Sequence, residues 1–304
     1  MEQAFRKAAI ALTEENKTKM RSIREIISSY ATAGLKLSLR QLYYQLVSVN
    51  AIANSEKEYA KLSHMVVEMR MGGVLDWDAI EDRIRVPSLP YSAESISEAI
   101  RDVQRQYRRN RMLGQENYIE AWCEKDALSG ILKQIVGPLH ITLMINRGYS
   151  SCSAMYEAAQ RLLAAQGLGQ ELKVLYVGDH DPSGLDMVRD IEDRMIEFGV
   201  TNLEVQHVAL TDEQVEKYAP PPNPSKVTDP RAKNYIEKYG YECWEVDALK
   251  PEVLSEIVKK QIAPLIDADQ FQKIMKLEMK DRDRLAIIAD NEMIPVPKPA
   301  RRKS

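Results

Sequence analysis

The stretch between Leu172 and Phe198 constrains the fold of this chain most, because it passes from a buried strand into a helix through an acidic turn. Its first part, residues 172–177, is a short apolar run rich in β-branched residues, which is typical of a strand covered on both faces. Apolar residues return at helical spacing from Leu185 and stop at Gly199. Ligands of open α/β sheets bind where such strands end. The turn at residues 178–184 is therefore a candidate site.

Two carboxylates lie in this turn, at Asp179 and Asp181. Residues two apart on an extended segment point to the same side, so these two converge while His180 faces away. Close carboxylates repel each other, and a bound divalent cation commonly relieves this repulsion. Asp181 precedes Pro182, however, and an Asp-Pro pair is also a good helix start that needs no catalytic role. The spacing alone leaves a metal site and a helix cap open.

Composition fits a globular protein without a membrane partner. The 304 residues are 44% apolar and 29% charged, enough for one large or two ordinary domains. The net charge of -3 is uninformative, because a balanced total can hide one basic and one acidic face. Three scattered cysteines argue against a zinc cluster or a disulfide framework and fit a reducing cytosol. No stretch approaches the roughly 18 apolar residues of a membrane span. We expect a cytoplasmic protein.

The first 90 residues read as helices. A helical pattern over residues 14–33 is followed by two helix starts, Ser38 with Gln41 and Ser55 with Glu58, each with capping-box spacing. Two capped helices joined by a short turn predict a helix-turn-helix, and residues 74–77 are expected to begin the strand of a winged variant. The second helix is then the candidate DNA reader, and its expected exposed positions include Lys57, Lys61 and Arg70, but also Glu56 and Glu68. A packed helical bundle is the alternative.

The pattern changes after Gly114. A helix predicted at residues 92–112 ends in a cationic run, which is a solvated face or, less commonly, a phosphate contact. Beyond it, strands alternate with amphipathic helices, which indicates a mainly parallel sheet covered by helices. The predicted strands are residues 118–123, 141–145, 172–177 and 203–210. The predicted domains are a winged-helix-like domain at 1–90, a helical connector at 91–114, an α/β domain at 115–250, and a helical extension with a basic tail at 251–304.

A third acid belongs with the two in the turn. Glu124 directly follows the first predicted strand, so a parallel sheet places it at the same edge as Asp179 and Asp181. It could equally be a solvated residue at a helix start, favoured there by the helix dipole.

Near the end of another predicted strand, residues 243–249, Glu245 or Asp247 either joins this metal site or caps the helix that begins at Pro251. We prefer the cap. Residues 220–224 are proline-rich and are predicted to form neither helix nor strand.

The order of these segments, strand-Glu-helix, strand, helix and strand-Asp-x-Asp-helix, resembles the Toprim domain. Toprim is a metal-binding module of topoisomerases, primases and some nucleases. The resemblance implies that Glu124, Asp179 and Asp181 hold Mg²⁺, and an all-oxygen ligand set favours Mg²⁺ over zinc.

A motif in the first half of the chain makes the resemblance more specific, because it is similar to the motif of one family. Arg40-Gln41-Leu42-Tyr43-Tyr44 is similar to the tyrosine motif of the topoisomerase VI A subunit and its meiotic double-strand-break relatives, of which this chain would be a shortened, bacterial or phage-type member. The family has an acidic residue where this chain has Gln41. The resemblance implies that Tyr44 attacks DNA and that Arg40 is the motif arginine. The alternative is that Tyr43 and Tyr44 pack in the core of an amphipathic helix. Arg40 precedes Tyr44 by one helical turn and can favour a phenolate whose usual pKa is near 10.

The resemblance implies Mg²⁺-dependent DNA cleavage through a tyrosyl-phosphate link. In that family each tyrosine faces the Toprim site of its partner, so a homodimer is expected. No phosphate-binding loop of an ATPase occurs in the sequence, and strand passage would need a separate ATPase subunit. Two alternatives remain: a Toprim nuclease that hydrolyses DNA with metal-activated water, and a non-catalytic DNA-binding or complex-assembly protein.

Overall fold

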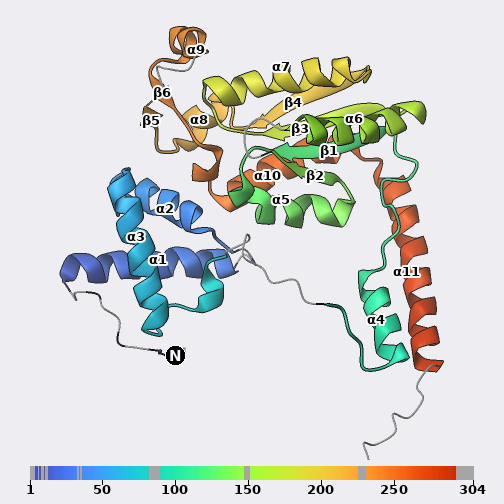
Figure 1. Cartoon of the computed structure of the whole chain (residues 1–304), viewed down its shortest axis with the longest axis horizontal. Helices are drawn as coiled ribbons and strands as arrows, with labels where there is room; N and C mark the ends of the chain where they lie inside the picture. Colours follow the sequence, from blue (N-terminus) through green and yellow to red (C-terminus); the bar gives the residue numbers. More distant parts are fainter. Residues whose placement is uncertain are drawn as a thin grey trace, which may run out of the picture. The chain divides into compact units, whose positions relative to one another are not determined.

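The computed structural model describes residues 4–5, 7, 10, 13–32, 34, 36–81, 90–146, 151–224 and 231–291. They belong to two compact units (Figure 1). The first comprises residues 1–84 and 117–265, and the second comprises residues 85–116 and 266–304. Residues 82–89 and the predicted basic tail after residue 291 lie outside the described residues.

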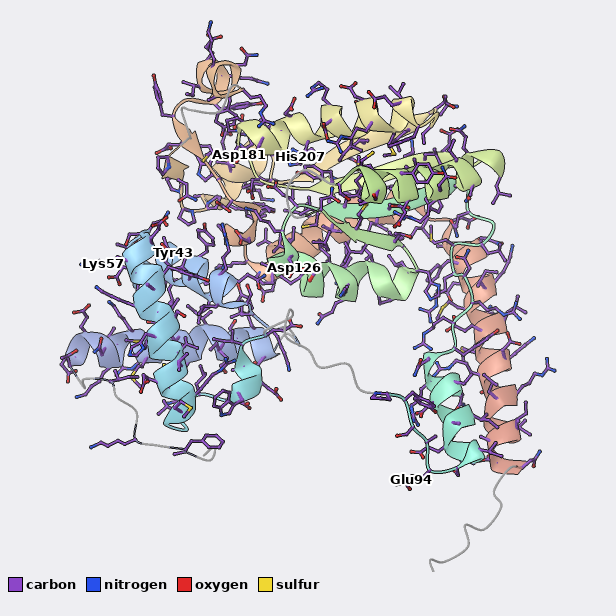
Figure 2. All side chains as sticks on the ribbon, in the orientation of Figure 1. Tyr43, Lys57, Glu94, Asp126, Asp181 and His207 are labelled. Carbon is purple, nitrogen blue, oxygen red and sulfur yellow. The ribbon has the colours of Figure 1, made fainter. Side chains whose placement is uncertain are left out.

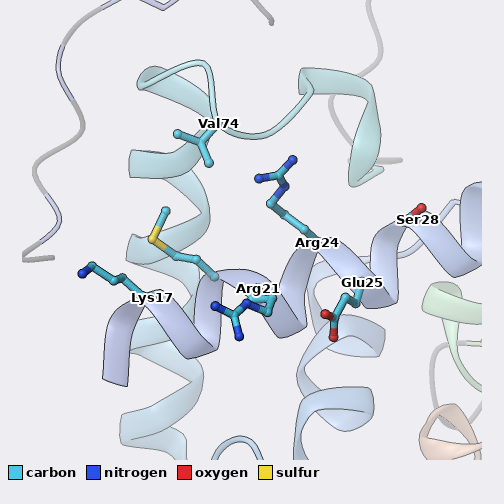
Figure 3. A pocket seen from close by; sticks show the side chains of 7 residues that line it. Lys17, Arg21, Arg24, Glu25, Ser28 and Val74 are labelled. Atoms are coloured by element: carbon cyan, nitrogen blue, oxygen red, sulfur yellow. The ribbon is translucent and has the colours of Figure 1, made fainter. Parts of the chain in front are cut away.

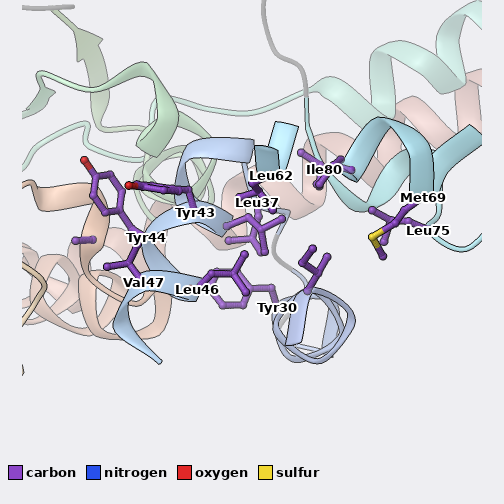
Figure 4. Close-up of a cluster of buried hydrophobic side chains, with 14 residues drawn as sticks. Tyr30, Leu37, Tyr43, Tyr44, Leu46, Val47, Leu62, Met69, Leu75 and Ile80 are labelled. Atoms are coloured by element: carbon purple, nitrogen blue, oxygen red, sulfur yellow. The ribbon is translucent and has the colours of Figure 1, made fainter. Parts of the chain in front are cut away.

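The first unit begins with three helices, α1 (Glu14–Thr32), α2 (Leu39–Ser48) and α3 (Glu56–Met71). The capping box at α2 is complete, since Ser38 and Gln41 each bond the other's backbone. The three helices bury a common apolar cluster (Figure 4). The strand predicted at residues 74–77 is wrong, because the chain turns after α3 into a short 3-10 helix, Trp77–Ala79, with Asp76 as its cap.

A four-stranded parallel sheet forms the second part of this unit, which confirms the predicted α/β class. Its strands are β1 (Asn117–Cys123), β2 (Thr142–Ile145), β3 (Glu171–Val177) and β4 (Leu203–Ala209), in the order β2-β1-β3-β4. Helices α6 (Cys152–Gly167) and α7 (Pro182–Glu197) cover one face of the sheet, and α5 (Ser129–Val136) and α10 (Pro251–Ile262) cover the other (Figure 1). Covered faces explain why β3 is apolar along most of its length.

One charged group is buried within this sheet. Glu120 on β1 is fully buried, and its two carboxylate oxygens accept hydrogen bonds from the Arg161 guanidinium at 2.8 and 2.9 Å. The Tyr118 hydroxyl and the Trp122 indole N–H donate to the same carboxylate. A buried carboxylate is tolerated only when it is paired in this way.

The chain after β4 departs from the prediction. It forms α8 (Asp212–Tyr218), α9 (Ala232–Tyr239) and a small antiparallel ribbon of β5 (Asn223–Pro224) and β6 (Glu242–Cys243). The prediction that 220–224 forms no strand is therefore wrong at its last two residues. The strand predicted at 243–249 is also wrong beyond Cys243, because residues 246–248 form a 3-10 helix.

The second unit pairs α4 (Ile96–Gln106) with α11 (Ala268–Asn291). The predicted cationic run is largely engaged in ion pairs. Arg111 contacts the buried Glu278 at 2.6 Å, and Arg109 contacts Asp281 at 2.5 Å. Such pairing fits a structural role for this run better than phosphate contact.

Among the described residues, no helix combines the length and apolarity of a membrane span.

We expect Arg161→Met to lower the free energy of unfolding by about 3 kcal/mol, because it leaves the Glu120 carboxylate buried without its counter-charge. The matched control is Arg189→Met. Arg189 also makes two ion pairs, but it is exposed on α7, so we expect a change within about 1 kcal/mol. Urea unfolding of both variants measures the difference. Equal losses would contradict the structural importance of the Glu120 pair.

Candidate functional site

The candidate site lies at the carboxyl edge of the sheet, where β1 and β3 end side by side. Cys123 and Val177 are paired in register, and the Glu124 backbone N–H donates to the Val177 carbonyl at 3.1 Å. This pairing brings Glu124 to the edge from which the turn with Asp179 and Asp181 departs. The structure therefore collects the three predicted acids at one edge, from two adjacent strands.

Glu124 is partly buried among other acids. The Tyr176 hydroxyl donates to its carboxylate at 3.3 Å. Burial is the main cause that raises the pKa of Glu124, the Lys125 charge opposes it, and the negative charge of Asp181 adds to the rise. A carboxyl group in this position gains from any cation that approaches it.

Asp179 is only 4% exposed, and both of its oxygens have partners. The Val246 backbone N–H donates to Oδ1 at 2.9 Å, and the Lys125 ammonium lies 2.6 Å from Oδ2. Burial nevertheless raises the pKa of Asp179 well above its ordinary value. Asp179 therefore holds the 3-10 helix at residues 246–248 as well as facing the site.

Asp181 is the N-cap of α7 (Figure 2), so the structural explanation for this residue is confirmed. Its Oδ1 accepts hydrogen bonds from the Gly184 N–H at 2.6 Å and from the Ser183 hydroxyl at 3.0 Å. A side chain at Gly184 would lie 2.2 Å from the Asp179 carbonyl oxygen, so only glycine allows α7 to pack this closely on the turn. His180 turns away from the acids, as predicted, and its ring contacts Tyr235.

Lys125 is the central cation of the site, and the sequence prediction missed it. Its Nζ lies 2.6 Å from Asp179 and 2.5 Å from Glu245. These carboxylates raise the pKa of Lys125 against the opposing effect of burial. A charge count could have found it, because several acids that converge on one buried edge need a cation nearby.

Glu245 and Asp247 do not cap the helix after Pro251, so that prediction is wrong. The residue before α10 is Lys250, without a side-chain cap. Arg40 from α2 instead contacts both acids, at 2.6 Å for Glu245 and 2.9 Å for Asp247. Arg40 and Lys125 share the same oxygen of Glu245. Pairing with a cation offsets the cost of burying these carboxylates, and capping an exposed helix end would not.

Tyr44 lies one helical turn after Arg40 and is 5% exposed. Figure 4 shows Tyr43 and Tyr44 at the edge of the apolar cluster, with their hydroxyl groups pointing away from it. The Arg40 guanidinium carbon lies 5.7 Å from the centre of the Tyr44 ring. Burial, with added repulsion from Glu245 and Asp247, raises the pKa of Tyr44 to about 12. Arg40 opposes that rise without cancelling it.

A cavity of about 520 Å³ opens beside these tyrosines. It is large enough for part of a nucleotide, and its polar rim includes Asn54, whose side chain bonds Asn223 at 2.7 Å. Eight residues line it: Arg40, Tyr43, Tyr44, Asn54, Ser55, Glu56, Tyr59 and Asn223. The small exposed part of Tyr44 therefore belongs to the lining of this cavity.

The acids fit a magnesium ion only in part. Among the described residues, no three His, Cys, Asp or Glu side chains gather as a metal site. Asp179 already has partners on both oxygens, but neither Glu124 nor Asp181 forms an ion pair within the described part of the chain. Mg²⁺ commonly takes one or two carboxylates and completes its shell with water and phosphate oxygens. Glu124 and Asp181 are the residues of this edge that would hold such an ion.

Comparison with known proteins finds no matching family, no matching curated protein and no matching solved structure.

The raised pKa of one buried acid predicts how stability changes with pH. Burial raises the pKa of Asp247 from its ordinary 3.8 to about 6, so the folded chain holds this proton over a pH range where the unfolded chain has lost it. Stability from this group is therefore greatest below about pH 4 and falls as the pH rises to about 6. The Asp247→Asn variant has no carboxyl group at this position to titrate, so its stability does not fall for this reason as the pH rises. We expect the variant to gain up to roughly 3 kcal/mol relative to the wild type between pH 4 and 7.

Urea unfolding at both pH values measures this difference, with Asp193→Asn on the exposed surface of α7 as the control. A difference between Asp247→Asn and the wild type that does not change with pH would show that Asp247 is ionised throughout.

Proposed function

We propose that this chain cleaves DNA in a Mg²⁺-dependent reaction, as a topoisomerase VI A-like protein whose Tyr44 forms a tyrosyl-phosphate link. One observation carries the proposal. Arg40, in the helix that bears Tyr44, pairs with the Glu245 oxygen that also binds Lys125, and Lys125 pairs with Asp179 at the edge of the sheet. The tyrosine and the acidic edge thus belong to one continuous charged network.

Each residue has a defined part in the proposed reaction. Glu124 and Asp181 hold the magnesium ion, which when bound supplies positive charge against the scissile phosphate. Arg40 orients the Tyr44 ring, and the Tyr44 oxygen attacks phosphorus. The bond from phosphorus to the deoxyribose oxygen breaks, the phenol gives up its proton to solvent, and the leaving oxygen takes a proton up.

The proposal includes DNA and a second copy of the chain as partners. A homodimer would bring two such sites to one duplex and cut both strands. Strand passage would further require a separate ATPase subunit. Cleavage itself needs neither nucleotide nor that subunit.

Hydrolysis by a metal-activated water is the second candidate, and the environment of Tyr44 favours it. A phenol whose pKa is raised to about 12 is almost entirely protonated at neutral pH and is therefore a weak nucleophile. In this reaction Glu124 and Asp181 keep their part, and Tyr44 only packs and lines the cavity.

Tyr44→Phe separates the two routes. Phe keeps the ring and its packing, so the free energy of unfolding should fall by only about 1 kcal/mol. If Tyr44 is the nucleophile, Mg²⁺-dependent cleavage of supercoiled plasmid and the protein-DNA adduct on a denaturing gel both disappear, while DNA binding survives. Tyr59→Phe, in the same cavity, is the matched control and should keep both. Cleavage by Tyr44→Phe at the wild-type rate would establish hydrolysis instead.

Glu124→Gln tests the acidic edge itself. It keeps the size of the side chain but removes the charge, so Mg²⁺-dependent cleavage should fall at least about a hundredfold by either route. The melting temperature should stay unchanged or rise, because repulsion from Asp181 and the cost of burying a carboxylate are relieved. Glu204→Gln, which alters an exposed ion pair with Lys173, is the control. Full metal-dependent activity of Glu124→Gln would reject the Toprim-like site.

A further inference from the structure

A groove of about 700 Å³ lies along α1 (Figure 3), and none of its lining residues belongs to the acidic site. Three cationic residues of one helix line it, Lys17, Arg21 and Arg24. Their positions i, i+4 and i+7 place them on the same face of α1. Met20 and Val74 supply the apolar part of the lining, and Glu25 is the one acid in it.

The spacing of these cations matches a phosphate backbone. Seven residues of an α-helix rise about 10 Å from the first cation to the third. Each strand of duplex DNA carries a phosphate about every 3.4 Å of helix axis, so three cations over that length can meet about three phosphates. A groove that holds the backbone also excludes part of the water that screens exposed charges.

The two arginines are free to bind such a ligand. Arg21 and Arg24 form no ion pair or hydrogen bond with side chains of the described residues, and both are exposed. Lys17 contacts Glu14 at 2.7 Å, but both side chains are at the surface, where such a pair contributes little and exchanges easily. The groove therefore presents three cations against one acid, Glu25, and carries a net positive charge.

The predicted reading helix α3 is less suited to this role. Lys61 is paired with Glu58 at 2.6 Å, and Arg70 donates to the backbone carbonyls of Trp77 and Ile80. Of the three cations predicted on α3, these two are therefore engaged within the protein. Lys57 lies at the start of α3 (Figure 2) and has no described ion pair.

We propose that the α1 groove, through Arg21 and Arg24 with Lys17 beside them, binds the phosphate backbone of duplex DNA. This inference rests on the proposed function for the identity of its ligand. It adds a binding surface distinct from the acidic edge, and it shifts the main phosphate contact of the helical part from α3 to α1. The contact is to backbone, so the groove binds duplexes of different sequence alike.

The experiment compares the full-length wild type with three double variants. These are Arg21→Ala with Arg24→Ala, Lys57→Ala with Lys61→Ala on α3, and the charge-conserving Arg21→Lys with Arg24→Lys. Binding to a short fluorescent duplex is measured by anisotropy over a range of salt concentrations, without Mg²⁺. Loss of two phosphate contacts should weaken binding at least about tenfold and lower the slope of log K against log salt by about 2. The α3 variant should change both quantities little. Arg21→Lys with Arg24→Lys should keep the wild-type slope.

The outcomes separate this inference from the proposed function. If the wild type binds duplex and the α1 variant binds equally well, the groove is not the contact, while DNA cleavage at the acidic edge still stands. A larger loss from the α3 variant than from the α1 variant returns the contact to α3. If the wild type binds no duplex at any salt concentration, both proposals fall. Thermal melts verify that each variant is folded, and the exposure of all four substituted side chains makes that the expected result.

Discussion

The first unit depends on the pairing of buried acids with two cations. Asp179, Glu245 and Asp247 converge where strands and helices end, and Lys125 and Arg40 lie among them. An unpaired charge in a protein interior costs several kcal/mol, so Asp179 and Glu245 depend on Lys125 and Arg40 as their counter-charges. Since Arg40 comes from α2 and Lys125 follows β1, the network also fastens the helical part to the edge of the sheet.

The same pairing controls what the edge can bind. Lys125 already compensates Asp179, whereas Glu124 and Asp181 make hydrogen bonds but no ion pair among the described residues. Burial raises the pKa of Glu124, and the negative charge of Asp181 adds to the rise. Arg40 is likewise shared between two acids, which leaves it less able to favour a phenolate at Tyr44. The acids of this network thus add to the rise in the pKa of Tyr44 that burial causes.

Local patterns predicted the sheet and most helices, because strand and helix periodicity, capping boxes and an Asp-Pro start are written in consecutive residues. Glu124 and Asp179 could be placed at one edge because parallel strands end together. The pairing of Arg40 with Glu245 spans 205 residues and has no local signal. The segments at 74–77 and 243–249 failed for a related reason. Their apolar residues pack on distant parts of the chain, and that packing, not strand periodicity, sets their conformation.

The division between engaged and free charges explains why the net charge of -3 says little about partners. Arg161, Arg111 and Lys125 neutralise acids inside their own units and offer nothing to a polyanion. In the proposed function, attraction to DNA comes from cations without such partners, and Arg21 and Arg24 are two that stand together on one helix. Under that proposal a weakly acidic protein holds a duplex by one short surface and keeps its acidic edge for a metal ion and a single phosphate.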